Sequence, residues 1–339
     1  MHIPYRTRVL LKRLGVIALI LLLVLGLCYL FWFLWLGRFV IYTREGGAVL
    51  DMTLPPQIAE GVPAVPPEEE QISIYYNEGD NAINVTRELT PIVGYYADEE
   101  MLADMELVKK QVGLLTTGTP VMLDVKDAKG RFFYSSHISS DRRSSIDPSV
   151  MDALIKELDK KGMYLIAKLP AFRDYAFGLR ATDNGLFVQS GAYLWADDDY
   201  CYWLDPTKQG TVTYLVEIVS ELKSLGFDEV VFGEFHFPDT DEIRFEGDRV
   251  QALNDTANTI ATSCADQSFT VSFISQEQGL VLPGDRSRLY MTDVAAADAA
   301  TVAEGFQLEN PAVHIVFLTE NHDTRFNDYS VLRPLDSAG

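Results

Sequence analysis

Two glutamates, each followed two positions later by a histidine, stand at the ends of predicted strands. They are Glu234 with His236, and Glu320 with His322. A carboxyl group can act as a nucleophile or exchange a proton with a reacting group. Because alternate side chains of a strand share a face, we expect each glutamate beside its histidine, with Glu234 on the face of Phe232. The sequence therefore predicts two Glu-His pairs, which converge if both faces point into one site.

A third carboxyl group, that of Asp124, ends another predicted strand, two residues before Lys126 and on the same face. A cation that close is expected to lower the pKa of the carboxyl group and keep it ionised. This favours a role in electrostatic stabilisation or hydroxyl binding over proton donation. For Glu234 the alternative is a salt bridge to Lys126 or Lys168, or exposure to solvent. The candidate catalytic residues are Asp124, Glu234 and Glu320.

The pattern of apolar runs predicts strands that alternate with helices, as in βα units around a parallel sheet. Seven strands are predicted, at 92–97, 121–125, 164–169, 229–235, 269–274, 289–293 and 313–318. Helical spacing predicts helices at 101–115, 148–161, 211–225 and 249–264. Gly162 and Gly226 are expected to end two of these helices in the left-handed conformation. The fold class is therefore α/β, a (β/α)8-type barrel that either lacks one strand or takes it from 72–76 or from the C-terminal tail.

Long connections follow the second and third predicted strands, at 127–147 and 170–210, whereas short glycine turns precede the strands. In barrel enzymes the site is built from loops at the carboxyl ends of strands, so we expect it on the long-loop face. The third-strand loop is rich in aromatic residues, which either line a sugar-binding cleft or form a satellite core. They are Phe172, Tyr175, Phe177, Phe187, Tyr193, Trp195, Tyr200, Tyr202 and Trp203.

Four short motifs resemble a bacterial family of glycoside-hydrolase-type TIM barrels. They are LDVKDAKG at 123–130, GFDEVVFGEFHFP at 226–238, WLDP at 203–206 and YTREG at 42–46. The resemblance covers residues 92–240 and implies a (β/α)8 TIM barrel that hydrolyses glycosidic bonds. The chain departs from the family pattern at two positions, having Gly233 where the family has aspartate and His236 where it has arginine.

The resemblance implies a polysaccharide or glycan substrate, cleaved by paired carboxylates. Glu234 after the fourth strand and Glu320 after the seventh stand where many retaining barrel glycosidases carry their acid/base and nucleophile. Asp205 either caps the following helix or orients a substrate hydroxyl group. The alternative function is a catalytically inactive barrel that binds a glycan or an envelope partner. The candidate substrate-binding residues are Lys126, Asp127, Trp195, Trp203, Asp205, His236 and His322.

An uncharged apolar stretch at 15–37 is long enough to cross a bilayer as a helix. Four cations precede it, which predicts a cytoplasmic N-terminus and an extracytoplasmic C-terminal domain in the cell membrane. A cleaved signal peptide is the alternative, but the stretch is longer than a typical one and ends in an aromatic belt. The expected organisation is a basic tail at 1–14, a membrane helix at 15–37, a proline-rich linker and N-terminal segment at 38–90, and a barrel at 91–339.

Composition and residue spacing exclude several classes of function. The 339 residues carry 28 Lys and Arg against 49 Asp and Glu, a net charge of −21, which excludes binding to nucleic acid through phosphate contacts. No nucleotide-binding or zinc-binding spacing occurs, so we expect no cofactor and no metal. The run Asp197-Asp198-Asp199 is either a solvated loop or a calcium contact. Cys201 and Cys264 are either a disulfide pair or free buried thiols.

Overall fold

The computed structural model describes residues 40–43, 47–50, 88–138, 146–266, 268–275, 277 and 279–338. It divides the chain into two units, Met1–Asp80 and Asn81–Gly339. In the first unit β1 (Val40–Thr43) pairs with β2 (Gly47–Leu50) as an antiparallel hairpin. The predicted membrane helix at 15–37 and the candidate strand at 72–76 lie outside the described residues. Among the helices that the structure describes, none is long and apolar enough to cross a membrane.

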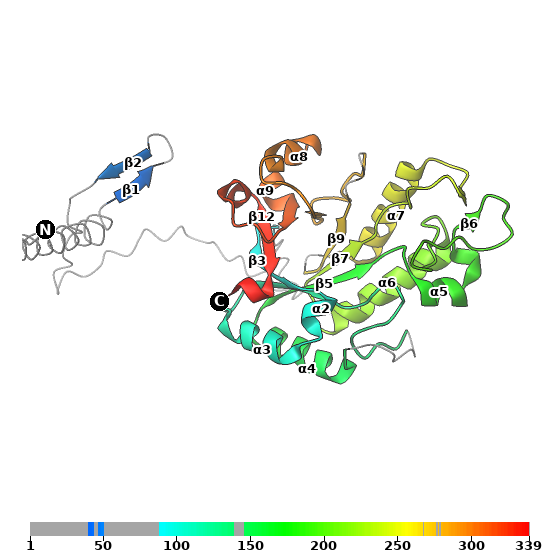
Figure 1. The fold of residues 1–339 in the computed structure, drawn as a ribbon, viewed down its shortest axis with the longest axis horizontal. Coiled ribbons are helices and arrows are strands. Elements are labelled where there is room, and N and C mark those ends of the chain that lie inside the picture. Colours follow the sequence, from blue (N-terminus) through cyan, green and yellow to red (C-terminus); the bar gives the residue numbers. More distant parts are fainter. Residues whose placement is uncertain are drawn as a thin grey trace, which may run out of the picture. The chain divides into compact units, whose positions relative to one another are not determined.

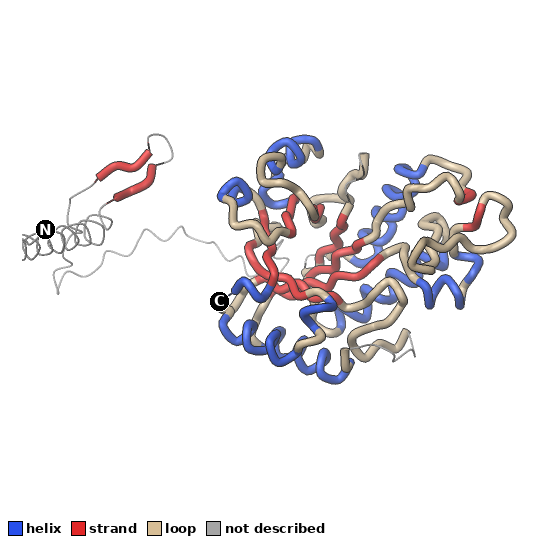
Figure 2. Tube along the Cα trace, viewed as in Figure 1, coloured by secondary structure: helices blue, strands red, loops and turns tan. Residues whose placement is uncertain are grey.

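Eight parallel strands of the second unit close into a barrel, with helices around it (Figures 1 and 2). In order around the ring they are β10 (Leu289–Met291), β11 (Ile315–Leu318), β12 (Ser330–Pro334), β3 (Val93–Ala97), β4 (Pro120–Asp124), β5 (Tyr164–Pro170), β7 (Glu229–Gly233) and β9 (Thr270–Ile274). The seven predicted strands are all present, and the eighth, β12, comes from the C-terminal tail. The (β/α)8 prediction is therefore confirmed with a complete ring of strands.

The larger helices follow their strands as the periodicity predicts. They are α4 (Pro148–Lys160), α6 (Gln209–Ser224) and α7 (Arg249–Cys264), after β4, β5 and β7. Gly162 and Gly226, with φ of 67° and 98°, make the left-handed turns that lead into β5 and β7, as predicted. Short helices α8 (Ala299–Gly305) and α9 (Pro311–His314) follow β10, and the 3-10 helices η4 (Thr324–Asp328) and η5 (Leu335–Ala338) follow β11 and β12.

The single helix predicted at 101–115 is wrong, because two helices occupy this region. They are α2 (Glu99–Leu102) and α3 (Met105–Leu114). Each has its own N-cap: Asp98 accepts a hydrogen bond from the backbone N–H of α2, and Asp104 does the same for α3. Asp104 has φ −102° and ψ 73°, outside the helical region, so the chain cannot continue as one helix through it.

Alternate strand residues face the barrel interior. The aliphatic middle of the interior includes Met122, Ile166, Val231, Val316 and Leu332, one from each of five strands. The intervening residues face outward, where they form a larger core with the helices. Each strand therefore contributes to two apolar layers, and the burial of both holds the barrel in register.

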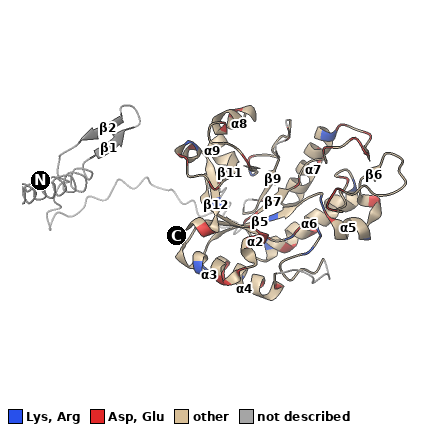
Figure 3. Cartoon of the chain, in the orientation of Figure 1, with Lys and Arg blue, Asp and Glu red and all other residues tan. Residues whose placement is uncertain are grey.

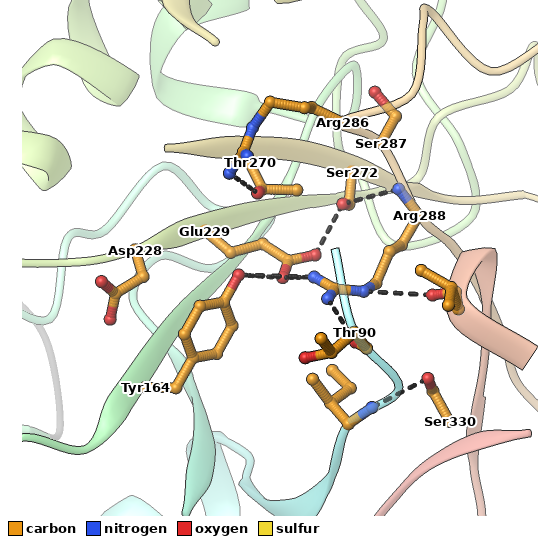
Figure 4. Close-up of polar contacts among 12 residues, drawn as sticks. Thr90, Tyr164, Asp228, Glu229, Thr270, Ser272, Arg286, Ser287, Arg288 and Ser330 are labelled. Carbon is orange, nitrogen blue, oxygen red and sulfur yellow. Dashed lines mark hydrogen bonds and ion pairs between the residues drawn. The ribbon is translucent and has the colours of Figure 1, made fainter. Parts of the chain in front are cut away.

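A buried ion pair lies in the barrel interior beside the amino-terminal ends of the strands (Figure 4). Glu229, the first residue of β7, accepts a hydrogen bond from Arg288 at 2.5 Å, and their side chains are 0% and 2% exposed. Tyr164, Ser272 and Tyr290 donate hydrogen bonds to the same carboxylate at 2.9, 2.6 and 3.0 Å. Arg288 thus neutralises the buried carboxylate, and the three hydroxyl groups complete its hydrogen bonds. A buried carboxylate requires both.

Arg288 is satisfied by backbone groups as well as by Glu229. Its guanidinium donates to the carbonyl oxygens of Val313 at 3.2 Å and of Thr90 at 3.0 Å. Thr90 precedes β3, and Val313 precedes β11. The arginine therefore joins three separate parts of the chain at the floor of the barrel.

The connection from β5 to α6 is the largest excursion from the barrel. It contains α5 (Tyr175–Arg180), η3 (Thr182–Asn184) and β6 (Phe187–Val188), and β6 pairs with β8 (Ile243–Arg244) from the connection after β7. Three of its aromatic side chains, those of Phe172, Phe177 and Trp203, are buried in the large core outside the barrel, where Phe177 stacks on Tyr214 with centroids 3.9 Å apart. Tyr193 and Tyr200 are exposed. Acidic residues lie on several outer helices, among them α3 and α4 (Figure 3).

We predict that Arg288→Met lowers the free energy of unfolding by about 3–5 kcal/mol, because it leaves the Glu229 carboxylate buried without its cation. Urea denaturation followed by circular dichroism measures this change. The matched control is Arg244→Met, whose ion pair with Glu246 lies at the surface, and it should change the unfolding midpoint little. Equal effects of the two substitutions would contradict a stabilising role for the buried pair.

Candidate active site at the barrel mouth

A cavity of about 1010 Å³ opens at the carboxyl ends of the strands. Inward-facing residues at the ends of β4, β5, β7 and β9 form part of its wall, namely Asp124, Lys168, Gly233 and Ile274. Of the predicted site residues, Asp124, Lys126, Asp127, Glu234 and His236 line this cavity together. The structure therefore brings five residues from two distant motifs to one place.

Asp124 is paired with a lysine, but not with the one that the sequence suggested. Its Oδ1 lies 2.8 Å from Nζ of Lys168 on the neighbouring strand β5, and its Oδ2 accepts a hydrogen bond from the backbone N–H of Glu99 at 3.2 Å. Burial raises the pKa of the Asp124 carboxyl above its ordinary value, although the Lys168 ammonium opposes this rise. The expectation that Lys126 lowers this pKa is therefore wrong.

Lys126 is instead bound to Asp174, a residue that the sequence analysis missed. The two charged groups are 2.7 Å apart and both side chains are 0% exposed. Tyr214 from α6 donates a hydrogen bond to the same Asp174 oxygen at 2.8 Å, and the other oxygen caps α5 by accepting from the N–H of Phe177. This buried pair fastens the connection after β4 to the long excursion after β5, which fixes one wall of the cavity.

Asp127 lies in a turn at the cavity rim. It accepts hydrogen bonds from the backbone N–H of Arg131 at 2.8 Å and from its Nε at 2.5 Å. The same guanidinium contacts Glu99 at 3.2 Å. Asp127 is therefore tied to a cation that joins the connections after β3 and β4.

Glu234 reaches the cavity through an unusual backbone conformation. Its φ is +49°, in the left-handed region, immediately after the last residue of β7. Glu229, Val231 and Gly233 face the interior, so strict alternation would turn Glu234 outward with Phe232, which packs in the outer core. The predicted shared face of Phe232 and Glu234 is therefore wrong, because the left-handed residue interrupts the alternation.

His236 lies directly against Glu234. Its Nε2 is 3.1 Å from Oε2 of Glu234, and its Nδ1 is 2.8 Å from the carbonyl oxygen of Phe237. The hydrogen bond from His236 lowers the pKa of the Glu234 carboxyl, and the same hydrogen bond raises the pKa of the imidazole. The cavity thus holds Asp124 and Glu99, whose carboxyl pKa values are raised by burial, and Glu234, whose carboxyl pKa is lowered.

Gly233, the residue before Glu234, leaves space in the wall of the cavity. A Cβ at this position would meet no atom nearer than 3.8 Å, the distance to Ile274 and to the carbonyl of Leu169. The position therefore has room for a side chain, and glycine there widens the cavity.

The two predicted tryptophans and Asp205 do not line this cavity. Trp203 is buried and packs on the His236 ring with centroids 5.2 Å apart, so it supports the site from behind. Trp195 donates a hydrogen bond to Glu242 at 2.9 Å. Asp205 accepts hydrogen bonds from the N–H and the hydroxyl group of Thr207 at 2.9 and 2.7 Å, in a turn that precedes α6. It does not cap this helix, whose N-terminus has no side-chain cap.

Glu320 and His322 follow β11, the seventh strand of the barrel, and both are exposed. Neither belongs to the lining of the cavity, which includes Leu318 from the same strand. The structure therefore does not bring Glu320 together with Asp124 and Glu234 in this cavity.

Three further observations concern chemistry that the sequence left open. Within the described part of the chain no group of acidic, histidine or cysteine side chains could hold a metal ion. Asp197 and Asp199 bind Arg173 instead, both at 2.6 Å. Cys201 and Cys264 are free and buried, and burial raises the pKa of the Cys264 thiol to about 11.

Of the two partners that the sequence analysis missed, Lys168 had a weak signal in the sequence. Lys168 stands inside an apolar strand run, where a charged residue must face a partner or a cavity. Asp174 had no such signal, because its importance comes from a contact with Lys126 across 48 residues of chain.

Comparison with solved structures gives two proteins that resemble parts of this chain. A hypothetical protein from Ruminiclostridium thermocellum is 22% identical over 56% of this chain and 100% of its own, with a TM-score of 0.47. The GH36 α-galactosidase AgaA from Geobacillus stearothermophilus is 16% identical over 74% of this chain, with a TM-score of 0.50. This chain covers 39% of that enzyme's length, and similarity at this level of identity shows the barrel fold alone.

No curated protein matches the chain. A family model does match, over residues 95–272, which is more than half of the chain and includes β4, β5, β7 and the residues around the cavity from Asp124 to Arg249. The chain therefore belongs to the family described as "Putative glycosyl hydrolase domain".

Proposed function

We propose that this protein is a membrane-anchored, extracytoplasmic glycoside hydrolase that cleaves a cell-envelope or extracellular polysaccharide. The observation that carries the proposal is the pair of carboxyl groups, Asp124 and Glu234, that line one cavity at the barrel mouth, the pKa of Asp124 raised by burial and that of Glu234 lowered by the hydrogen bond from His236. Membership in a glycosyl hydrolase-type family supports it.

Glycoside hydrolysis needs a proton donor and an ionised carboxylate on either side of the bond that breaks. Groups whose pKa values are pushed apart are suited to these two roles. Asp124, with its raised pKa, protonates the leaving oxygen. Glu234, with its lowered pKa, attacks the anomeric carbon or removes a proton from the attacking water. The anomeric configuration of the product distinguishes these two roles of Glu234.

We predict that the full-length chain in detergent releases reducing ends from at least one member of a polysaccharide panel. Glu234→Gln and Asp124→Asn should each lower kcat by about 100-fold or more, because each removes one member of the pair. Glu320→Gln is the matched control, an identical chemical change at an exposed glutamate outside the cavity, and should leave kcat within a few fold. If Glu320→Gln lowers kcat strongly and Glu234→Gln does not, Glu320 is the catalytic residue and Glu234 is not.

A second prediction concerns pH. Glu234 has to be ionised, so activity should fall as pH drops through its lowered pKa, and Asp124 has to be protonated, so activity should fall as pH rises through its raised pKa. The optimum should therefore lie between the lowered pKa of Glu234 and the raised pKa of Asp124. The profile of kcat/KM against pH measures both limbs, and a flat profile across the acidic range would contradict the assignment.

The alternative function is a catalytically inactive barrel that binds a glycan or an envelope partner. It is favoured by Gly233, which leaves the last inward position of β7 without a carboxyl group. Binding of a glycan by the purified chain, with no reducing ends released over a pH series, would support this alternative and exclude hydrolysis of that glycan.

The membrane anchor rests on the apolar stretch at 15–37 and the cations before it. We predict that the full-length chain stays in the membrane pellet after alkaline carbonate extraction. Protease added outside intact spheroplasts should digest the barrel and leave a short N-terminal fragment in the membrane. Recovery of a soluble chain shortened near residue 37 would instead indicate a cleaved signal peptide.

A further inference from the structure

The hydrogen bonds of His236 determine how many protons it carries. Its Nδ1 faces the carbonyl oxygen of Phe237 at 2.8 Å, and a carbonyl oxygen can only accept, so Nδ1 has to carry a hydrogen. Its Nε2 faces Oε2 of Glu234 at 3.1 Å, and an ionised carboxylate can also only accept. A neutral imidazole with its proton on Nδ1 would therefore point a lone pair at the carboxylate.

This contact requires one more proton, shared between Nε2 and Oε2. Carboxylic acids are ordinarily stronger acids than imidazolium, so the proton belongs on the imidazole while Glu234 remains ionised. The resulting charge-assisted hydrogen bond is stronger than a neutral one. Both side chains are partly exposed, 41% for His236 and 37% for Glu234, and both line the cavity.

The surroundings hold the imidazole ring in this orientation. Trp203 packs on the ring, and its Nε1 donates a hydrogen bond to Asp197 at 3.0 Å. Asp197 is bound in turn by Arg173 at 2.6 Å. The long connection after β5 thus carries a chain of contacts that ends at the carboxylate of Glu234.

We propose that His236 is held as an imidazolium ion that keeps Glu234 ionised and fixes its carboxylate in the cavity. His236 is on this view a positioning residue, since it acts through Glu234. Its contribution to turnover rests on the proposed hydrolase function, whereas its protonation state is a property of the protein alone.

Charged groups around Glu234 and His236 affect the pH at which each of the two gains or loses its charge. Arg173 favours and Asp197 disfavours ionisation of Glu234, while Glu277 favours the imidazolium form of His236. Because the pKa of His236 is raised, the imidazolium persists to a higher pH than an ordinary imidazolium ion does, and it is lost as pH rises through that pKa. The carboxylate is lost only as pH falls through the lowered pKa of Glu234.

Nuclear magnetic resonance tests the proposal without any substrate. In the full-length chain labelled with ¹⁵N-histidine, both ring nitrogens of His236 should be protonated at pH 7, as assigned by comparison with His236→Gln. In Glu234→Gln the ring should become a neutral imidazole at the same pH. His314→Gln is the control, since His314 contacts Ser287 and does not line the cavity. A His236 ring with one unprotonated nitrogen at pH 7 in the unsubstituted chain would overturn the proposal.

Kinetics test the consequence for Glu234. His236→Gln can still donate a hydrogen bond but has no charge, and it should lower kcat by about 10- to 100-fold with little change in KM. His236→Arg restores a permanent cation and should recover most of this loss. Unchanged kcat in His236→Gln would overturn the positioning role. If the imidazolium is observed but no glycan is cleaved, the proposed hydrolase function fails while the charge state of His236 stands.

Discussion

The narrow interior of a closed ring of strands is the constraint on which the rest of this structure depends. Every second strand residue has to fill that interior. The interior has three layers. The ion pair of Glu229 with Arg288 lies at the floor, aliphatic side chains fill the middle, and Asp124, Lys168 and Gly233 lie at the mouth. The ion pair at the floor is buried and its charges are satisfied. The mouth is open, and the inward-facing side chains there present charged groups to a cavity.

The long connection after β5 is part of the site even though few of its residues reach the cavity. It is fastened to the barrel by the buried contact of Lys126 with Asp174, and it supports His236 through Trp203. Two residues that the sequence suggested as direct substrate contacts, Lys126 and Trp203, are thus bound to protein groups. Their contribution is to hold the walls of the cavity that Asp124 and Glu234 line.

Much of the fold could be predicted because it follows from local periodicity. The strand and helix runs have clear apolar spacing, and Gly162 and Gly226 mark turns that only a left-handed residue fits. Contacts between distant residues left no such pattern, so the partner of Asp124 was mistaken. The orientation of Glu234 was also unpredictable, because a single positive φ in a residue other than glycine reverses the expected face. The grouping of Asp124 with Glu234 followed from their strand ends alone.

The two unpaired thiols of the barrel have a consequence for where the protein can acquire its structure. Cys201 lies in the connection after β5 and Cys264 ends α7, and neither is cross-linked. The described part of the barrel is therefore held together by packing and hydrogen bonds, without covalent links between distant parts of the chain. Its folding requires no oxidising enzyme, and the same native state is accessible in reducing and in oxidising surroundings.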